Sequence, residues 1–214
     1  MSGIKQANEI VLRTQQDRII SKNLQTESSY HIKDILEQIA SNYPILIEYK
    51  KANNNDEFII KVPLIIKSLN IQANIIFGTL GGALKTIFKQ KVVLQCRHFM
   101  QDVSFQECIF EDSLSIMGCN FHKDALFDNA KINGFFVGSK SVFHKQASFW
   151  NVDFKEIPNF SGVGFTESNL VNFVNAKVDN SFEKLSQLAK NQTKGKDNDT
   201  SNQIRNDIRD SYRT

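Results

Sequence analysis

The stretch from Val103 to Leu170, VSFQECIFEDSLSIMGCNFHKDALFDNAKINGFFVGSKSVFHKQASFWNVDFKEIPNFSGVGFTESNL, decides how this chain folds. Large apolar side chains recur along it at intervals of five or six residues, and five of the twelve intervals are six. These residues are Phe105, Phe110, Ile116, Phe121, Phe127, Ile132, Val137, Phe143, Phe149, Phe154, Phe160, Phe165 and Leu170. Because an α-helix repeats every 3.6 residues and a strand every two, this period belongs to neither.

A second residue, usually small, stands two positions before each of these large residues. Two residues that are two positions apart share one face of an extended segment, so each repeat buries a small and a large side chain together. The small set is Val103, Cys108, Cys119, Ala125, Ala130, Ser141, Ala147, Val152, Val163 and Ser168, and Phe135 is a large exception before Val137. A chain that turns every five or six residues and keeps these positions inside winds into stacked coils. The pattern therefore predicts a β-solenoid with both sets facing inward.

Four segments carry a family resemblance: Cys119-Asn120-Phe121, Val152-Asp153-Phe154, Pro158-Asn159-Phe160 and Ser168-Asn169-Leu170. They resemble the pentapeptide-repeat proteins, whose loose consensus is Ala, then Asp or Asn, then Leu or Phe, then two variable residues. The resemblance implies a mainly β fold, a right-handed quadrilateral β-helix with four repeats to a coil. It covers roughly residues 99–182. The six-residue intervals depart from the family pattern and imply bulges or altered corners, whose places the sequence leaves open.

Two other interpretations of the period are weaker. A left-handed hexapeptide β-helix would imply an acyltransferase, but it needs sustained intervals of six and aliphatic residues smaller than Phe at the inward site. An irregular β-rich domain would need thirteen consecutive matches to arise by accident.

The rest of the chain divides around the repeats. The expected parts are a helical N-terminal region at 1–57, extended segments leading into or forming the first coils at 58–97, the repeat β-helix at 98–181, and C-terminal helices at 182–214 with a polar linker at 191–202. Within the first part, the apolar spacing of residues 30–41 predicts an amphipathic helix. The first C-terminal helix is expected to cover the open end of the coils. The last helix has no stop signal before Thr214, which suggests a longer protein.

The charge and the cysteines limit the class of protein. The net charge is +3, distributed as +5 over residues 1–97, −4 over 98–182 and +2 over 183–214. No segment has the basic density of a nucleic-acid-binding arm, so nucleic acid is not an expected partner. Three cysteines with uneven spacing suit neither a disulfide framework nor a zinc site, which favours a reduced, cytoplasmic protein. No signal peptide or membrane-spanning segment is visible in the sequence.

The residues predict no catalytic, metal or cofactor site. The glycine-rich stretch at residues 78–86 is compared with a phosphate-binding loop, but Leu84 stands where that motif needs Gly before Lys85. His98, His122 and His144 fall outside the inward positions and are expected to be exposed turn residues.

These features predict a non-enzymatic β-helical scaffold for protein–protein interaction, with a partner that the sequence does not identify. The family suggests one alternative, a DNA-mimicking modulator of bacterial type II topoisomerase (gyrase), although lysines interspersed in a segment of only −4 make a poor duplex mimic. A further alternative is the soluble part of a longer membrane-associated pentapeptide-repeat protein. The oligomeric state stays open, and an end-to-end dimer is compatible with stacked coils.

Overall fold

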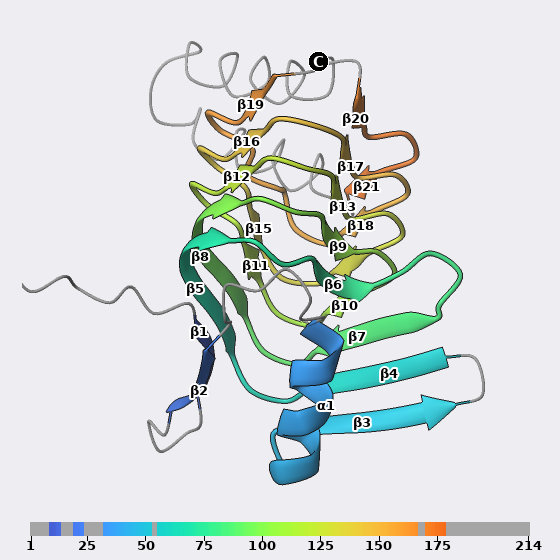
Figure 1. The fold of residues 1–214 in the computed structure, drawn as a ribbon. Helices are drawn as coiled ribbons and strands as arrows, with labels where there is room; N and C mark the ends of the chain where they lie inside the picture. Colours follow the sequence, from blue (N-terminus) through green and yellow to red (C-terminus); the bar gives the residue numbers. More distant parts are fainter. Residues whose placement is uncertain (1–8, 14–18, 24–31, 53–54, 167–169, 179–214) are drawn as a thin grey trace, which may run out of the picture.

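The computed structural model describes residues 9–13, 19–23, 32–52, 55–166 and 170–178 of the chain. This part of the protein is mainly β: many short parallel strands, stacked in the manner of a β-helix, accompany one helix, α1 (Ile32–Asn42). Figure 1 shows successive turns of the chain lying one above another, with the sequence running upward through the stack from β3 and β4 to β19 and β20.

Three sheets run along the stack, and nearly every strand pair in them is parallel. The first contains β1 (Glu9–Arg13), β2 (Ile19–Asn23), β5 (Leu64–Ile71), β8 (Val92–Phe99), β11 (Leu114–Ser115), β12 (Asn120–Phe121), β15 (Phe136–Val137), β16 (Val142–Phe143) and β19 (Gly164–Phe165). The second contains β3 (Ile47–Ala52), β4 (Asn55–Ile60), β7 (Leu84–Phe88), β10 (Ile109–Phe110), β14 (Lys131–Ile132), β18 (Asp153–Phe154) and β21 (Lys177–Val178). The third contains β6 (Ile75–Gly78), β9 (Val103–Phe105), β13 (Ala125–Leu126), β17 (Ala147–Ser148) and β20 (Val171–Asn172).

The register of these strands gives the length of one coil. Ile109 pairs with Lys131, and Lys131 pairs with Asp153, a step of 22 residues each time. Four five-residue repeats would make a step of only about 20 residues, so the coil is longer than the pentapeptide pattern implies. The step is 28 residues in the first coils, where Leu64 pairs with Val92, and 24 in the last, where Ala147 pairs with Val171.

The extra residues occupy fixed corners of the coil. When the inward positions are taken from the structure, intervals of five and six alternate from Phe105 to Phe165. Each five-residue interval contains one residue with a left-handed backbone, whereas none lies in the six-residue intervals. The left-handed residues are Glu107, Gly118, Asn129, Lys140, Asn151, Gly162 and Asn175. A left-handed residue reverses the chain within fewer residues, so it accounts for the shorter corners.

One of these corners predicts a stabilising substitution. Lys140 has a φ of 59°, whereas Gly118 and Gly162 occupy the equivalent corner in the coils on either side. A left-handed conformation costs an L-residue about 1–2 kcal/mol, and glycine loses about 0.5–1 kcal/mol through its flexible unfolded chain. We therefore expect Lys140→Gly to raise the free energy of unfolding by about 0.5–1 kcal/mol, measured by chemical denaturation.

The matched change at the same corner is Gly118→Ala. Nothing lies within 4 Å of a Cβ built on Gly118, so only the backbone conformation opposes the substitution. It should lower the free energy of unfolding by about 1 kcal/mol. A loss of stability in Lys140→Gly, or a gain in Gly118→Ala, would contradict this account of the corners.

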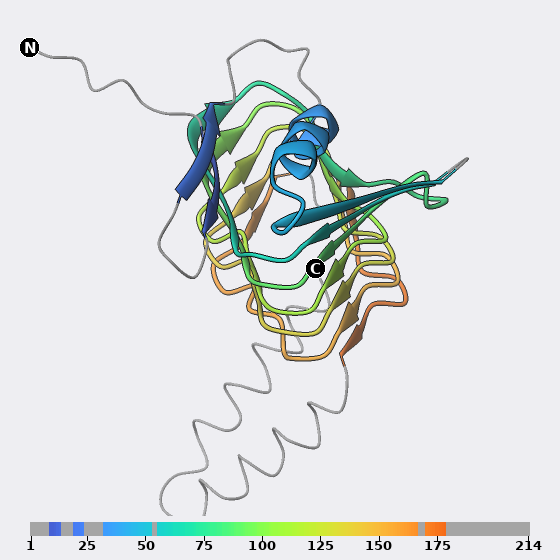
Figure 2. The same ribbon diagram turned by 90° about the horizontal axis from the view of Figure 1, so that it is seen from below.

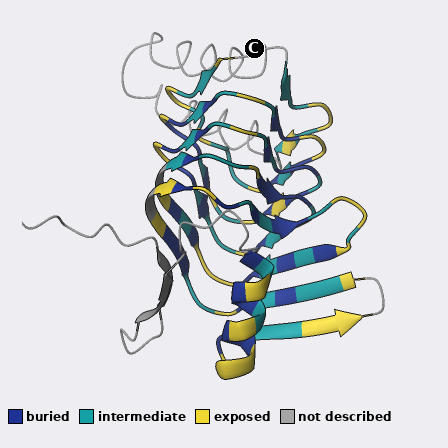
Figure 3. Cartoon of the chain, in the orientation of Figure 1, coloured by how far each residue is buried: buried dark blue, intermediate teal, exposed yellow. Residues whose placement is uncertain are grey.

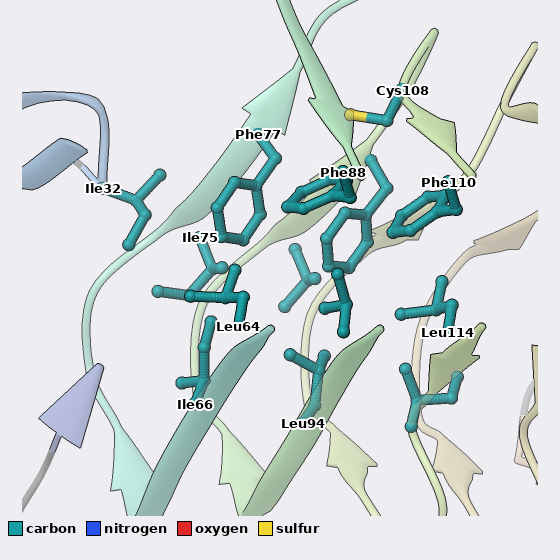
Figure 4. Packing of buried hydrophobic residues seen from close by; sticks show 14 of the residues in the cluster. Ile32, Leu64, Ile66, Ile75, Phe77, Phe88, Leu94, Cys108, Phe110 and Leu114 are labelled. Carbon is teal, nitrogen blue, oxygen red and sulfur yellow. The ribbon is translucent and has the colours of Figure 1, made fainter. Parts of the chain in front are cut away.

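The core lies between the sheets and is dominated by phenylalanine. Figure 3 shows buried residues repeating at the same places in successive coils, and Figure 4 shows Phe77, Phe88 and Phe110 packed beside the aliphatic side chains of Leu64 and Leu114. Phe88 and Phe110 stack nearly parallel, with ring centroids 4.7 Å apart. Rings two strands apart in the same stack therefore touch face to face, an arrangement that adds to their burial energy.

Helix α1 covers the N-terminal end of this core. Its apolar residues recur at spacings of three and four, and Ile32, Leu36 and Ile39 are all buried. In Figure 2, which looks along the stack, α1 lies across the end of the coils. Lys33 on the solvent side of the helix forms an ion pair with Asp56 on β4, and the hydroxyl of Tyr49 donates to the same carboxylate at 3.1 Å. This carboxylate joins the helix to the β3–β4 hairpin.

The Asp56 ion pair predicts a loss of stability in acid. The hydrogen bond from Lys33 lowers the pKa of Asp56 below its ordinary value, and the hydrogen bond from Tyr49 acts in the same direction. A carboxyl with a lowered folded-state pKa stabilises the fold above its unfolded pKa, near 3.9, and loses this contribution as the pH falls through the folded pKa. At pH 7 we expect Asp56→Asn to lower the free energy of unfolding by about 1–2 kcal/mol.

Denaturation curves of wild type and Asp56→Asn at pH 7 and near pH 3 test this prediction. The difference between the two proteins should shrink at the lower pH. The control is Asp34→Asn, a change on an exposed residue of the first turn of the same helix. An equal difference between wild type and Asp56→Asn at both pH values would mean that the charge of Asp56 does not stabilise the helix contact.

The prediction of a helical region at residues 1–57 is wrong outside α1. Residues Glu9–Arg13 form β1, which pairs antiparallel with both β2 and β5. β3 and β4 form a hairpin where the sequence indicated a polar turn, and β4 pairs with β7 in the stack. These pairings join segments far apart in sequence, so the weak local periodicity of the N-terminal region could not predict them. The predicted C-terminal helices at 182–214 and their linker lie outside the described residues.

Candidate interaction surface

Most of the predicted inward residues lie inside the stack. Among the large set, the side chains at most 2% exposed are Phe105, Phe110, Ile116, Phe121, Phe127, Ile132, Phe143, Phe149 and Phe154. In the small set, Val103, Cys108, Cys119, Ala125, Ala130, Ser141, Ala147 and Val152 are fully buried. Phe160, Val163 and Phe165, near the C-terminal end of the described coils, are partly buried and pack against the same core. This leaves the intervening side chains of each strand to form the outer surface.

The predicted inward residue Val137 is wrong by one position. Phe136 is the buried residue, 1% exposed, while Val137 is half-buried on the outer side. Phe136 pairs with Leu114 of the preceding coil, and Gly138 takes the place that Ile116 occupies there. The ring of Phe136 fills the room beside Gly138, because a Cβ on Gly138 would lie 2.8 Å from ring atom Cε1. The large residue has thus moved from the second inward position of this strand to the first.

The last predicted repeat, Ser168 with Leu170, is also out of register. The ring of Phe173, not Leu170, stacks on Phe149, with centroids 4.8 Å apart and planes 3° apart. Two extra residues in this coil shift the pairing, since Ala147 aligns with Val171. Leu170 is half-buried at the corner, and Ser168 lies outside the described residues.

Two large apolar side chains stand out from the face formed by β11 and β15. Phe135 immediately precedes β15 and is 61% exposed, and Met117 follows β11 and is 58% exposed. Ser115 and Val137 pair between them on the outer side of the two strands. Ile157, half-buried, lies 22 residues after Phe135 and leads into the bridge between Val137 and Asn159. The face therefore carries an apolar group of Met117, Phe135, Val137 and Ile157, which we call the β11–β15 patch.

Three histidines lie on the outer side of the neighbouring face, which β8, β12 and β16 form. Nδ1 of His98 lies 3.0 Å from Nε2 of His122, and the rings of His122 and His144 stack with centroids 4.7 Å apart. Burial lowers the pKa of His122, and the charges of His144 and His98 lower it further. Sequence reasoning treated these residues as separate turn residues. The only available signal was the 22-residue spacing of His122 and His144, which requires the coil length to be known.

A buried polar cluster surrounds Asp128 at the corner after β13. Its carboxylate accepts hydrogen bonds from Nε2 of Gln106 at 2.9 Å, from the hydroxyl of Ser148, and from the backbone N–H of Trp150 at 3.1 Å. Every buried side-chain nitrogen and oxygen in the described residues has a hydrogen-bond partner. The cluster joins three successive coils, and this arrangement stabilises the stack without leaving a group poised for chemistry.

The glycine-rich turn between β6 and β7 holds no arrangement for phosphate. The backbone N–H of Gly81, which a phosphate would need, donates at 2.9 Å to the carboxylate of Glu107. Gly81 and Gly82 both have positive φ, as a tight turn requires. A carboxylate at this place repels an anion, so the turn and the phosphate-binding motif differ in chemistry as well as in sequence.

The described cysteines are buried rather than reactive. Burial raises the pKa of the Cys108 thiol to about 12, so it stays protonated at neutral pH. Cys119 is equally buried, and its thiol donates to the carbonyl of Leu94 at 3.4 Å. Both fill the small inward position as compact apolar side chains.

Comparison with known proteins adds no assignment. No protein-family model matches the chain, and neither the curated proteins nor the solved structures contain a match. Within the described ranges, no group of three or more His, Cys, Asp or Glu side chains is arranged to hold a metal ion. A search of the same ranges for a helix with the length and apolar character needed to span a bilayer finds none.

Proposed function

We propose that this protein is a non-enzymatic β-helical scaffold that binds another protein through the β11–β15 patch. The observation that carries the proposal is the exposure of Phe135 and Met117, at 61% and 58%, on a face of the stack. Single exposed apolar residues are common on protein surfaces, but here two large ones flank two others on adjacent strands. Phe and Met are among the residues enriched at protein interfaces, and charged residues are depleted there.

The rigidity of the stack favours this role. The backbone of each strand on this face is held from both sides: the N–H of Leu114 donates to the carbonyl of Phe135 at 2.9 Å, and that of Ile116 donates to Val137 at 2.8 Å. The buried ring of Phe136 anchors the strand from inside. A partner that docks on such a preorganised surface loses little conformational entropy on the scaffold side, so a small apolar patch can bind usefully.

The finer fold belongs to the same proposal. We infer a right-handed, four-sided β-helix related to the pentapeptide-repeat proteins, with corners of five and six residues in place of uniform pentapeptides. The stacked rings of Phe99, Phe121 and Phe143, 5.0 and 4.9 Å apart, support it, because they repeat one inward position in successive coils. No acidic groove favours the DNA-mimic alternative: Lys89 pairs with Glu111 and Lys155 with Asp153 on the outer face of the second sheet.

The test compares partner capture by the full chain and by a patch variant, Phe135→Ser with Met117→Ser. Proteins captured by the wild-type chain from cells of its natural source would be identified by quantitative mass spectrometry. The matched control is Ile109→Ser with Leu126→Ser, which removes half-buried outward side chains from the two other sheets. We expect a partner that binds wild type and control but is lost, by about tenfold or more, from the patch variant. If every captured protein binds the patch variant as well as wild type, the patch is not the interaction surface.

A further inference from the structure

The structure brings His98 and His122 together although they lie in different coils. His98 is the second-last residue of β8, and His122 directly follows β12, so both side chains flank inward phenylalanines and point outward. The phenylalanines beside them, Phe99 and Phe121, stack with centroids 5.0 Å apart and planes 3° apart. The two histidine backbones are therefore fixed by the core, and their facing nitrogens lie 3.0 Å apart.

This spacing is that of two adjacent ligands of one metal ion. Imidazole nitrogens bind divalent first-row metals at about 2.0–2.1 Å, so two nitrogens 3.0 Å apart subtend an angle of about 94° at a shared metal. A tetrahedral ion would require about 3.3 Å between the same two atoms at this bond length. An angle near 90° suits the square-planar or octahedral coordination of Cu²⁺ and Ni²⁺ rather than the tetrahedral coordination of Zn²⁺.

We propose that His98 Nδ1 and His122 Nε2 form a two-ligand site for Cu²⁺ or Ni²⁺ on the outer face of the stack. Both rings are half-buried, so the remaining coordination positions of the ion open toward water. Two protein ligands are fewer than the three that a closed site needs, so the site is an open one that can accept a further ligand from solvent or from a bound molecule.

The proton balance allows the ion to enter without a change in net protonation. In the metal-free pair, one ring donates its N–H to the other across the 3.0 Å contact. Metal binding needs both facing nitrogens free of protons. The donating ring therefore moves its proton to its other nitrogen, a change of tautomer only, and both rings stay neutral.

His144 supplies the control. Its ring stacks face to face on His122, with centroids 4.7 Å apart and planes 7° apart, so its nitrogens do not converge on the contact between His98 and His122. Removing His144 should leave the two ligands in place. It carries the same chemistry on the next strand of the same face, which makes it a matched position for substitution.

Isothermal titration of the full chain with Ni²⁺, prepared without a polyhistidine tag, tests the site. We expect one saturable Ni²⁺ per chain, an affinity lowered by about tenfold or more in His98→Gln and in His122→Gln, and a change of no more than about twofold in His144→Gln. Thermal denaturation of each variant without metal checks that the fold is retained, so that a loss of binding is not a loss of structure. Zn²⁺ should bind more weakly than Ni²⁺.

Absence of saturable Ni²⁺ binding to the wild-type chain would overturn the proposal, as would unchanged affinity in His122→Gln. An equal loss in His144→Gln would also overturn it, because the ion would then not lie between His98 and His122. Tighter binding of Zn²⁺ than of Ni²⁺ would contradict the coordination angle from which the ion was assigned.

Discussion

Replacing Phe149 with alanine is expected to lower the free energy of unfolding by about 3–5 kcal/mol. The ring is fully buried between two others, with centroids 4.7 Å from Phe127 and 4.8 Å from Phe173, and both pairs of planes are 3° apart. Removing it leaves a cavity in the middle of a column whose neighbours are held by their own coils. The backbone cannot collapse into this space without breaking the strand pairing on either side. Chemical denaturation measures the loss.

Lys123→Ala is the matched control for this substitution. Lys123 is exposed at a corner of the same stack, and its removal should change the free energy of unfolding by no more than about 0.5 kcal/mol. If Phe149→Ala unfolded at the same denaturant concentration as wild type, or if Lys123→Ala proved equally damaging, the assignment of the inward face would be wrong.

Gly138→Ile should be nearly as damaging, with an expected loss of about 3 kcal/mol. The new Cβ would lie 2.8 Å from Cε1 of Phe136, which is closer than non-bonded carbons approach. The ring cannot move away easily, because Phe127, Phe149 and Phe154 meet it edge-on with centroids 5.5–6.0 Å away. Chemical denaturation of the variant gives the cost of the overlap.

A second substitution should reverse most of that loss. Phe136→Leu with Gly138→Ile recreates the Leu114 and Ile116 arrangement of the preceding coil, in which both side chains are fully buried. We expect the double variant to unfold within about 1–2 kcal/mol of wild type, so the two changes are strongly coupled. If instead the losses of the two single variants simply add in the double variant, Phe136 and Gly138 do not share one space.

The sequence predicted the interior well because the signal is local and repeated. Each repeat carries its own small and large inward residues, so an error at one position does not affect the next. The register failed at residues 135–137, where three successive large apolar residues offer several candidates for the inward site. Only the packing of Phe136 against Gly138 and the rings around it distinguishes them.

Features that depend on contacts between coils could not be predicted. The pairing of β1 with β5 joins residues more than fifty positions apart, and no local pattern encodes it. The meeting of His98 with His122, and the exposure of Phe135 beside Met117, follow from the 22-residue coil and its alternating corners. An average interval between five and six residues, read from a misplaced inward position, does not give that length.

The coil length is tested most directly by disulfide formation between cysteines placed on adjacent coils. Lys131 and Asp153 are paired and 22 residues apart, at about 4.8 Å between Cα atoms in parallel strands, within the range that a disulfide bridges. The comparison pair is Asn133 with Asp153, 20 residues apart, which would be aligned in a coil of four pentapeptides. Cys108 and Cys119 are kept, because both are buried. Peptide mass spectrometry after mild oxidation should find the intramolecular disulfide in Lys131→Cys with Asp153→Cys and little in Asn133→Cys with Asp153→Cys; preferential cross-linking of the second pair would contradict the 22-residue coil.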